Sequence, residues 1–323
     1  MLRLGAVPCS PLPGCLSEGP VWDERREELL WVDITERLIH RATLTPRRDG
    51  SGLPDLAPTG TLRLDRPVGA VVPCASGALL AAAGTSFLRL DEGRPPVEVA
   101  APDLPRDGVR RRMNDAACDP RGRLLAGTMA YDETPGAGAL HRLDHDGVVT
   151  LLDSVTISNG LGWSPDGRQL YYADSPTGRV DVFDYDAETG TLGDRRPFAV
   201  LPRGVPDGLA VDAGGRVWVA VWGGGEVRAY MPDGTLHARV EVPASHVTSC
   251  AFAGPDLDVL VITTATQGLD EERRRAEPDA GRLFVCRPGV TGLPATPYDD
   301  TSVTDPPHRA SRVSPASRAP SEP

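Results

Sequence analysis

The sequence predicts an all-β protein, a six-bladed β-propeller with four antiparallel strands per blade. Three observations lead to this fold class. A turn followed by a short apolar strand recurs six times along the chain, and a second short strand follows each copy. Glycine and proline, 35 and 32 of the 323 residues, are spread through the chain rather than gathered in one tract. Many turns with few long apolar runs are typical of all-β proteins.

The repeat has a regular spacing. Its clearest copies lie at residues 119–128, 164–173 and 212–220, and weaker copies lie at 23–32, 74–83 and 254–262. The apolar residue that opens the strand marks the same phase in each copy. These markers are Leu29, Leu79, Leu124, Leu170, Val217 and Leu260. Successive markers are 43 to 50 residues apart, which matches the period of four-stranded propeller blades.

The other strands fit the same plan. A second strand is expected in each unit, at 38–42, 87–90, 139–143, 180–183, 227–230 and 283–286. Turn signals such as Asp146-Gly147 and Asp233-Gly234 separate these strands, so we expect antiparallel meanders. The strand at 2–6 is expected to close the ring against the last blade, which removes two open sheet edges. The charged segment 269–276 is expected to be a loop or a single helical turn, and an irregular β-sandwich is the alternative fold.

One propeller domain is predicted over residues 1–301. Residues 302–323 are rich in Ser, Pro and Arg with almost nothing apolar, so we expect a disordered tail. No stretch approaches the roughly 20 apolar residues of a membrane-spanning helix, and the N-terminus has no signal-peptide core. A cytoplasmic protein with no membrane partner is predicted. The six cysteines form no metal-ligand spacing and are expected to be reduced thiols.

Charge and composition exclude several function classes. The formal net charge of −11 argues against a nucleic-acid partner, because such binding needs a basic surface. All 34 basic residues are arginine, and the absence of lysine excludes Schiff-base aldolases, pyridoxal-phosphate enzymes and P-loop proteins. The chain also has neither a G-x-S-x-G elbow nor an H-E-x-x-H motif.

A candidate site follows from the phase of the repeat. Residues 10 or 11 before each marker should begin the innermost strands and face one mouth of the central channel. Four of the six residues at this phase are carboxylates or carboxamides: Glu18, Asn114, Asn159 and Asp207. Val68 and Ser249 occupy the other two places. Glycine follows Glu18, Asn159 and Asp207, which permits a sharp turn or a close approach of a ligand.

Converging carboxylate and amide oxygens predict a bound cation. The two carboxylates would repel one another around a channel unless a positive charge lay between them. We therefore expect one divalent metal ion as cofactor. An all-oxygen ligand set favours Ca²⁺, Mg²⁺ or Mn²⁺, and Zn²⁺ also accepts carboxylate.

Several motifs resemble those of one known family. They are Leu16-Ser-Glu-Gly-Pro-Val-Trp22, Arg112-Met-Asn-Asp115, the turn 119–122 leading into Gly127-Thr-Met129, Ile157-Ser-Asn-Gly-Leu161 and Val205-Pro-Asp-Gly-Leu209. In collinear order, from about residue 4 to about residue 290, the chain resembles the senescence-marker-protein/gluconolactonase (regucalcin-like) family. The resemblance implies a six-bladed propeller and a metal-dependent hydrolase of sugar lactones.

The resemblance also implies roles for individual residues. Glu18, Asn159 and Asp207 would be metal ligands, and Asp207 would also be the catalytic acid/base residue. Arg112 and Asn114 would contact the carbonyl or the hydroxyls of the substrate.

Three positions depart from the family pattern or vary within it. Asp132 would accept a hydrogen bond from a substrate hydroxyl, but some members carry Glu there. Ser17 stands where Gly is usual, and Ala116 replaces a common Gly. These departures bear on the choice of substrate more than on activity.

The expected chemistry is the opening of a lactone to its aldonic acid. The cation would polarise the lactone carbonyl or activate a water molecule, and Asp207 would take up the proton and return it to the ring oxygen. Two alternatives stay open: a metal-dependent phosphotriesterase or aryl esterase on the same propeller, and a non-enzymatic calcium-binding propeller. The protein is expected to be a monomer or a small homo-oligomer.

Overall fold

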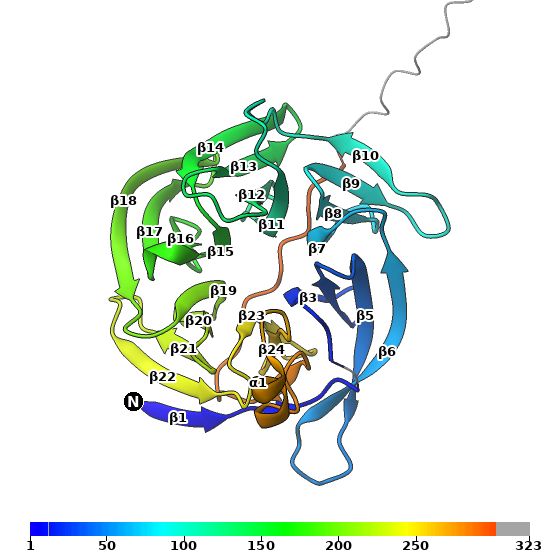
Figure 1. The fold of residues 1–323 in the computed structure, drawn as a ribbon, viewed down its shortest axis with the longest axis vertical. Coiled ribbons are helices and arrows are strands. Elements are labelled where there is room, and N and C mark those ends of the chain that lie inside the picture. The colour runs from blue at the N-terminus through cyan, green and yellow to red at the C-terminus, as the bar shows by residue number, and fades with distance from the viewer. Residues whose placement is uncertain (12, 302–323) are drawn as a thin grey trace, which may run out of the picture.

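The computed structural model describes residues 1–11 and 13–301, and the predicted tail at 302–323 lies outside the described residues. Six antiparallel sheets stand around a ring like the blades of a propeller (Figure 1). The predicted fold class is therefore confirmed. Each blade runs outward from an innermost strand beside the central axis.

The first three blades each contain four consecutive strands. Blade 1 consists of β3 (Ser17–Asp23), β4 (Glu28–Asp33), β5 (Leu38–Pro46) and β6 (Pro54–Arg63). Blade 2 consists of β7 (Val68–Pro73), β8 (Leu79–Ala83), β9 (Ser86–Leu90) and β10 (Val97–Ala100). Blade 3 consists of β11 (Arg111–Cys118), β12 (Leu124–Ala130), β13 (Gly138–Asp144) and β14 (Gly147–Val155).

The last three blades include both ends of the propeller. Blade 4 consists of β15 (Ser158–Trp163), β16 (Gln169–Asp174), β17 (Arg179–Asp186) and β18 (Thr191–Val200). Blade 5 consists of β19 (Val205–Val211), β20 (Val217–Trp222), β21 (Glu226–Tyr230), β22 (Leu236–Glu241) and the added β1 (Leu2–Gly5). Blade 6 consists of β23 (Val247–Ala253), β24 (Val259–Thr264), β25 (Phe284–Cys286) and β2 (Val7–Pro8).

The N-terminal segment closes the ring in a different way from the prediction. The strand expected over 2–6 does not join the last blade: β1 pairs in parallel with β22 of blade 5. The next strand, β2, pairs antiparallel with β25 and completes blade 6. The edges differ in length, because β25 has three residues and β22 has six. The short edge accepts only the two-residue β2, whereas the longer edge accepts the four residues of β1.

Two short helices complete the described fold. The segment expected as a loop or a single turn forms α1 (Glu271–Ala276), whose first turn is capped by the Asp270 carboxylate accepting from Arg273 N. A 3₁₀ turn, η1 (Ser175–Thr177), follows β16. No described helix is long and apolar enough to cross a membrane.

Apolar side chains fill the spaces between neighbouring blades. In one such cluster Tyr171 and Val182 of blade 4 pack with Val211 and Val219 of blade 5. Of the six phase markers only Leu79 keeps appreciable exposure, and the others are buried. The second strand of each blade is buried on both faces, so its apolar residues form a short continuous run that makes the repeat recognisable in the sequence.

Every innermost strand carries a β-bulge at the same height. The ladder register shifts between Glu18 and Val21, Val68 and Ala70, Met113 and Ala116, Ser158 and Leu161, Pro206 and Leu209, and Val247 and Ser249. A bulge leaves its residues outside the ladder and turns their side chains in a new direction. Six bulges at one height therefore aim side chains at one level of the channel.

Glycines on these bulges allow adjacent innermost strands to come very close. A Cβ at Gly160 would lie 2.4 Å from the backbone oxygen of Asp207, and a Cβ at Gly208 would lie 2.1 Å from Ser249 Oγ. No side chain fits at such distances. The glycines after Asn159 and Asp207 are thus required by packing between blades.

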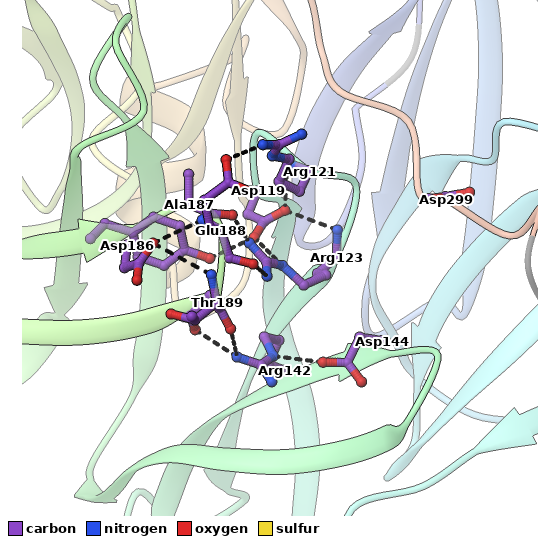
Figure 2. A network of polar contacts seen from close by, with 12 residues as sticks. Asp119, Arg121, Arg123, Arg142, Asp144, Asp186, Ala187, Glu188, Thr189 and Asp299 are labelled. Carbon is purple, nitrogen blue, oxygen red and sulfur yellow. Dashed lines mark hydrogen bonds and ion pairs between the residues drawn. The ribbon is translucent and has the colours of Figure 1, made fainter.

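Arginine side chains connect neighbouring blades on the surface (Figure 2). Arg123 and Arg142 of blade 3 donate hydrogen bonds to four backbone carbonyls of the turn at 187–190 in blade 4. The carboxylates of Asp119 and Asp144 hold the two guanidinium groups in position. The planar guanidinium has donors on several sides and can serve two carbonyls and a carboxylate at once.

The segment that follows β25 forms a strap across the ring, defined here as residues 287–301 (Figure 1). Near its start, Ala213 N of blade 5 donates to Thr291 O. Near its end, Tyr298 N donates to Pro73 O of blade 2. The strap thus joins two sides of the ring that are far apart.

We expect the substitution Gly160→Ala to lower the free energy of unfolding by about 1–3 kcal/mol, because the new Cβ would overlap the Asp207 carbonyl. Urea unfolding measures the change. Gly5→Ala is the matched control, since nothing lies within 4 Å of its ideal Cβ. Equal losses in the two variants would contradict the close-approach argument.

Candidate functional site

A cavity of about 340 Å³ opens at one mouth of the central channel. Five of the six predicted site residues line it: Glu18, Arg112, Asn114, Asn159 and Asp207. They come from four different blades and meet only because the ring closes. The structure thus brings these five residues together at one mouth of the channel.

The bulges explain how these side chains reach the cavity. Asn114, Asn159 and Asp207 are themselves bulged residues, in β11, β15 and β19. Glu18 lies just before the bulge of β3, where Gly19 has φ = 52° and donates its N–H to Glu18 Oε2 at 3.1 Å. A left-handed φ of this kind is readily adopted only by glycine.

Hydrogen bonds fix the two amides and the arginine. Arg112 Nη1 donates to Asn114 Oδ1 at 2.7 Å, and Asn114 Nδ2 donates to Ser158 O of the next blade at 3.0 Å. Asn159 Nδ2 donates to Ser175 Oγ at 3.0 Å. The Asn159 amide is therefore oriented by its nitrogen, and its oxygen stays available.

Two buried oxygens in the site have no hydrogen-bond partner among the described residues. They are Asn159 Oδ1 and Asp207 Oδ1. Both residues are almost fully buried and line the same cavity. Because an unsatisfied buried oxygen is costly, such a pair indicates that a ligand supplies the missing interaction.

The carboxyl groups of the site lie in an unfavourable environment for negative charge. Burial raises the pKa of Glu18 well above its usual range, and repulsion from Asp207 and Asp115 raises it further. Burial and the charge of Asp115 likewise raise the pKa of Asp207, against the lowering effect of the Asn159 side chain and of Arg112. The side chain of Arg112 is half-buried, and the loss of solvation lowers the pKa of its guanidinium.

These features fit a hard cation. Glu18, Asp207 and Asn159 Oδ1 together offer oxygen donors of the kind that Ca²⁺, Mg²⁺ and Mn²⁺ prefer. Within residues 1–11 and 13–301, no group of three or more His, Cys, Asp or Glu side chains is arranged to hold a metal ion. The donor set therefore depends on the amide oxygen as well as on the two carboxylates.

Three consecutive arginines have three different surroundings. Arg110 lies 4.8 Å above the ring centre of Tyr131, and Arg111 forms a two-point ion pair with Asp107. Only Arg112 lines the cavity. Successive side chains along a strand point to opposite faces, and a bulge follows in β11. Both features direct the three arginine side chains to different surroundings.

The sixth predicted residue, Asp132, does not line the cavity. Its side chain is exposed, and Oδ1 accepts from Thr134 N and Thr134 Oγ1 at 3.2 and 2.7 Å. The next residue, Glu133, has φ = 56° and lines the cavity instead. Asp132 thus shapes the turn that presents Glu133.

Sequence reasoning missed other residues of the site. Asp115 follows Asn114 directly and lies in the wall of a narrower cavity of about 130 Å³ along the channel, where burial raises its pKa to about 6. Its only sequence signal is this adjacency. Gln267 lines the main cavity from the loop after β24, outside the phase of the repeat. Trp222, the last residue of β20, also lines the cavity.

The fold and the site together define a class of protein: a six-bladed propeller with one buried carboxylate-and-amide site at a channel mouth. The chain belongs to the SMP-30/Gluconolactonase/LRE-like family, whose model matches residues 16–266. Regucalcin from Gallus gallus is 37% identical over 294 residues, which cover 88% of this chain and 94% of that protein.

Solved structures of similar proteins agree with this membership. A calcium-binding protein, regucalcin, from Agrobacterium tumefaciens superposes with a TM-score of 0.80 and 29% identity, over 92% of this chain and 99% of that one. A luciferin-regenerating enzyme superposes with a TM-score of 0.78 and 29% identity, over 91% of this chain and 100% of that one.

We expect Asp115→Asn to stabilise the metal-free protein at pH 7 and to change it little at pH 4. The folded protein holds the Asp115 proton more tightly than the unfolded chain, so wild-type stability falls as pH rises from about 4 to about 6. The asparagine carries no charge, and the gain at pH 7 should be about 2 kcal/mol.

Urea unfolding at the two pH values measures this effect. The exposed residue Asp153 provides the control variant Asp153→Asn, which should unfold like wild type at both pH values. A loss of stability in Asp115→Asn that is the same at pH 4 and pH 7 would show that the carboxyl is not destabilised by burial.

Proposed function

We propose that this protein is a lactonase, a hydrolase that opens sugar lactones to aldonic acids with the help of one divalent cation. The observation that carries the proposal is the pair of unpartnered buried oxygens, Asn159 Oδ1 and Asp207 Oδ1, beside Glu18 in one cavity. The family description includes gluconolactonase, which supports a cyclic ester as substrate.

The proposed metal ligands are Glu18, Asn159 and Asp207. A similar solved structure is described as a calcium-binding protein, which supports a divalent cation, and Ca²⁺, Zn²⁺, Mn²⁺ and Mg²⁺ are the candidates. When bound, the cation would supply electrostatic polarisation of the lactone carbonyl. It would also relieve the repulsion between Glu18 and Asp207.

The chain's own residues would do the rest of the chemistry. Arg112, held by Asn114, offers guanidinium N–H groups to the carbonyl or to a ring hydroxyl. Asp207 is proposed to accept a proton from the attacking water while the water oxygen bonds to the carbonyl carbon. The bond from the carbonyl carbon to the ring oxygen then breaks, and Asp207 returns the proton to that oxygen. Burial raises the pKa of Asp207 in the metal-free site, and the charge of a bound cation would lower it and keep the carboxylate ionised, ready to accept the proton.

The decisive measurement is proton release from a panel of five- and six-membered aldonolactones, corrected for spontaneous hydrolysis. Metal-stripped protein is compared with protein given Mn²⁺, Zn²⁺, Mg²⁺ or Ca²⁺. We expect background rates without metal and rapid hydrolysis of at least one lactone with one of the ions. Turnover of an aryl ester or a phosphotriester but of no lactone would move the assignment to the esterase. Calcium binding with no turnover at all would favour a binding protein.

Variants of the site connect that activity to particular residues. Asp207→Asn should lower kcat by about 10²–10⁴-fold, which is the usual contribution of a general acid/base. Glu18→Gln should weaken binding of the metal in calorimetric titration. Circular dichroism should show both variants folded. Full activity in either one would rule out this arrangement of roles.

For the carboxylate that contacts a substrate hydroxyl, the geometry favours Glu133 over Asp132. We expect Glu133→Gln to raise KM by about 10-fold, the effect of losing one charge-assisted hydrogen bond. Asp132→Asn keeps an oxygen for Thr134 and should leave KM within about twofold, as is typical of an exposed polar substitution. The opposite ranking of the two variants would restore Asp132 as the contact.

A further inference from the structure

One wall of the cavity is an aromatic ring pair. Trp222, the last residue of β20, lines the cavity and stacks on His246, with ring centres 4.1 Å apart and an angle of 12° between the planes. An isolated antiparallel bridge joins the two residues and so connects blade 5 to blade 6. His246 itself lies behind the tryptophan and is 8% exposed.

The ring pair is held in one position. His246 Nδ1 lies 2.9 Å from Gln267 O, and because a carbonyl only accepts, Nδ1 carries the proton. Burial lowers the pKa of His246, which keeps the imidazole neutral. Gln267 N in turn donates to Cys15 O of the N-terminal segment. The indole of Trp222 is therefore a fixed plane.

The blade 3 side of the cavity carries charged groups beside the apolar Met129. Arg112 and Glu133 belong to blade 3, and Figure 1 shows β11 and β12 across the ring from β20 and β23. A molecule in this cavity thus meets a flat aromatic surface on one side and a guanidinium with a carboxylate on the other. A ring that has C–H groups on one face and hydroxyls around its edge matches both surfaces.

We propose that Trp222 is a specificity-determining residue that recognises the closed ring of the substrate by stacking on it. The inference rests on the proposed function and adds the selection of cyclic over open-chain molecules. When the ester bond breaks, the ring opens and the flat face is lost. The aldonic acid then loses the stacking contact and leaves, while the next lactone gains it.

The chain provides a matched control. Trp31 stacks on His40 in blade 1, with ring centres 5.0 Å apart and 20° between the planes. Neither ring lines the cavity. Trp31→Phe therefore removes part of an equivalent ring pair without touching the site.

The test uses two amide probes, which resist hydrolysis far better than the ester of a lactone. Glucono-1,5-lactam carries its amide in a ring, and gluconamide carries it in an open chain. Calorimetric titration measures the Kd of each for wild type, Trp222→Ala, Trp222→Phe and Trp31→Phe. The protein is supplied with the cation that supports turnover, or with Ca²⁺ if none does.

We expect wild type to bind the lactam more tightly than gluconamide. Trp222→Ala should weaken lactam binding by about 10-fold and leave gluconamide within about twofold, with Trp222→Phe in between. Trp31→Phe should change neither Kd. In turnover, Trp222→Ala should raise KM for lactones and change kcat little.

The proposal is overturned if Trp222→Ala weakens both probes equally, if it weakens neither, or if wild type shows no preference for the lactam. Should Trp222→Ala fail to fold, Trp222→Phe decides, because it keeps a smaller ring in place. Failure of the proposed function would give a different experimental result. Wild type would then hydrolyse no lactone, whatever the ring preference of the binding measurements.

Discussion

The close approach of the innermost strands is the constraint on which the rest of the structure depends. Neighbouring strands come so near one another at Gly160 and Gly208 that no side chain fits there. The bulge beside each contact takes one or two residues out of the ladder and turns them to the channel. The packing that closes the ring thus also places Asn159 and Asp207. Fold and site cannot be altered independently at this level of the channel.

The same convergence makes the site electrostatically demanding. Glu18, Asp115 and Asp207 are held near one another in largely desolvated positions, and Arg112 is the cation that faces Glu18 and Asp207. Residues on separate blades cannot move apart, because each is fixed by the blade behind it. The repulsion between these carboxylates therefore persists in the folded protein, and a bound cation would reduce it. The metal affinity that we propose would then depend on the rigidity of the scaffold as much as on the ligands themselves.

The sequence predicted those parts that repeat. The second strand of each blade is buried almost throughout and recurs as a short apolar run after a turn, so the blades and the phase of Glu18 and Asn159 could be found by counting. The turn after β12 differs in length from the corresponding turns of the other blades, and in it the left-handed residue Glu133, not Asp132, lines the cavity. The predicted pairing of β1 with the last blade was wrong for a similar reason. The length of the free sheet edge decides which blade the strand joins, and that length depends on where strands distant in the sequence end. Gln267 belongs to a loop outside the repeat.

The strap across the ring changes how such a protein should come apart. In a purely modular array each unit contacts only its neighbours, and units can melt one at a time. Here the segment after β25 ties Ala213 in blade 5 to Pro73 in blade 2, while β2 ties the start of the chain to blade 6. Loss of blade 2 or blade 5 therefore removes an anchor of the strap and loosens its hold on the opposite side of the ring. We expect unfolding to be an all-or-none event, and folding must wait for contacts between residues 276 positions apart, such as Pro8 and Phe284.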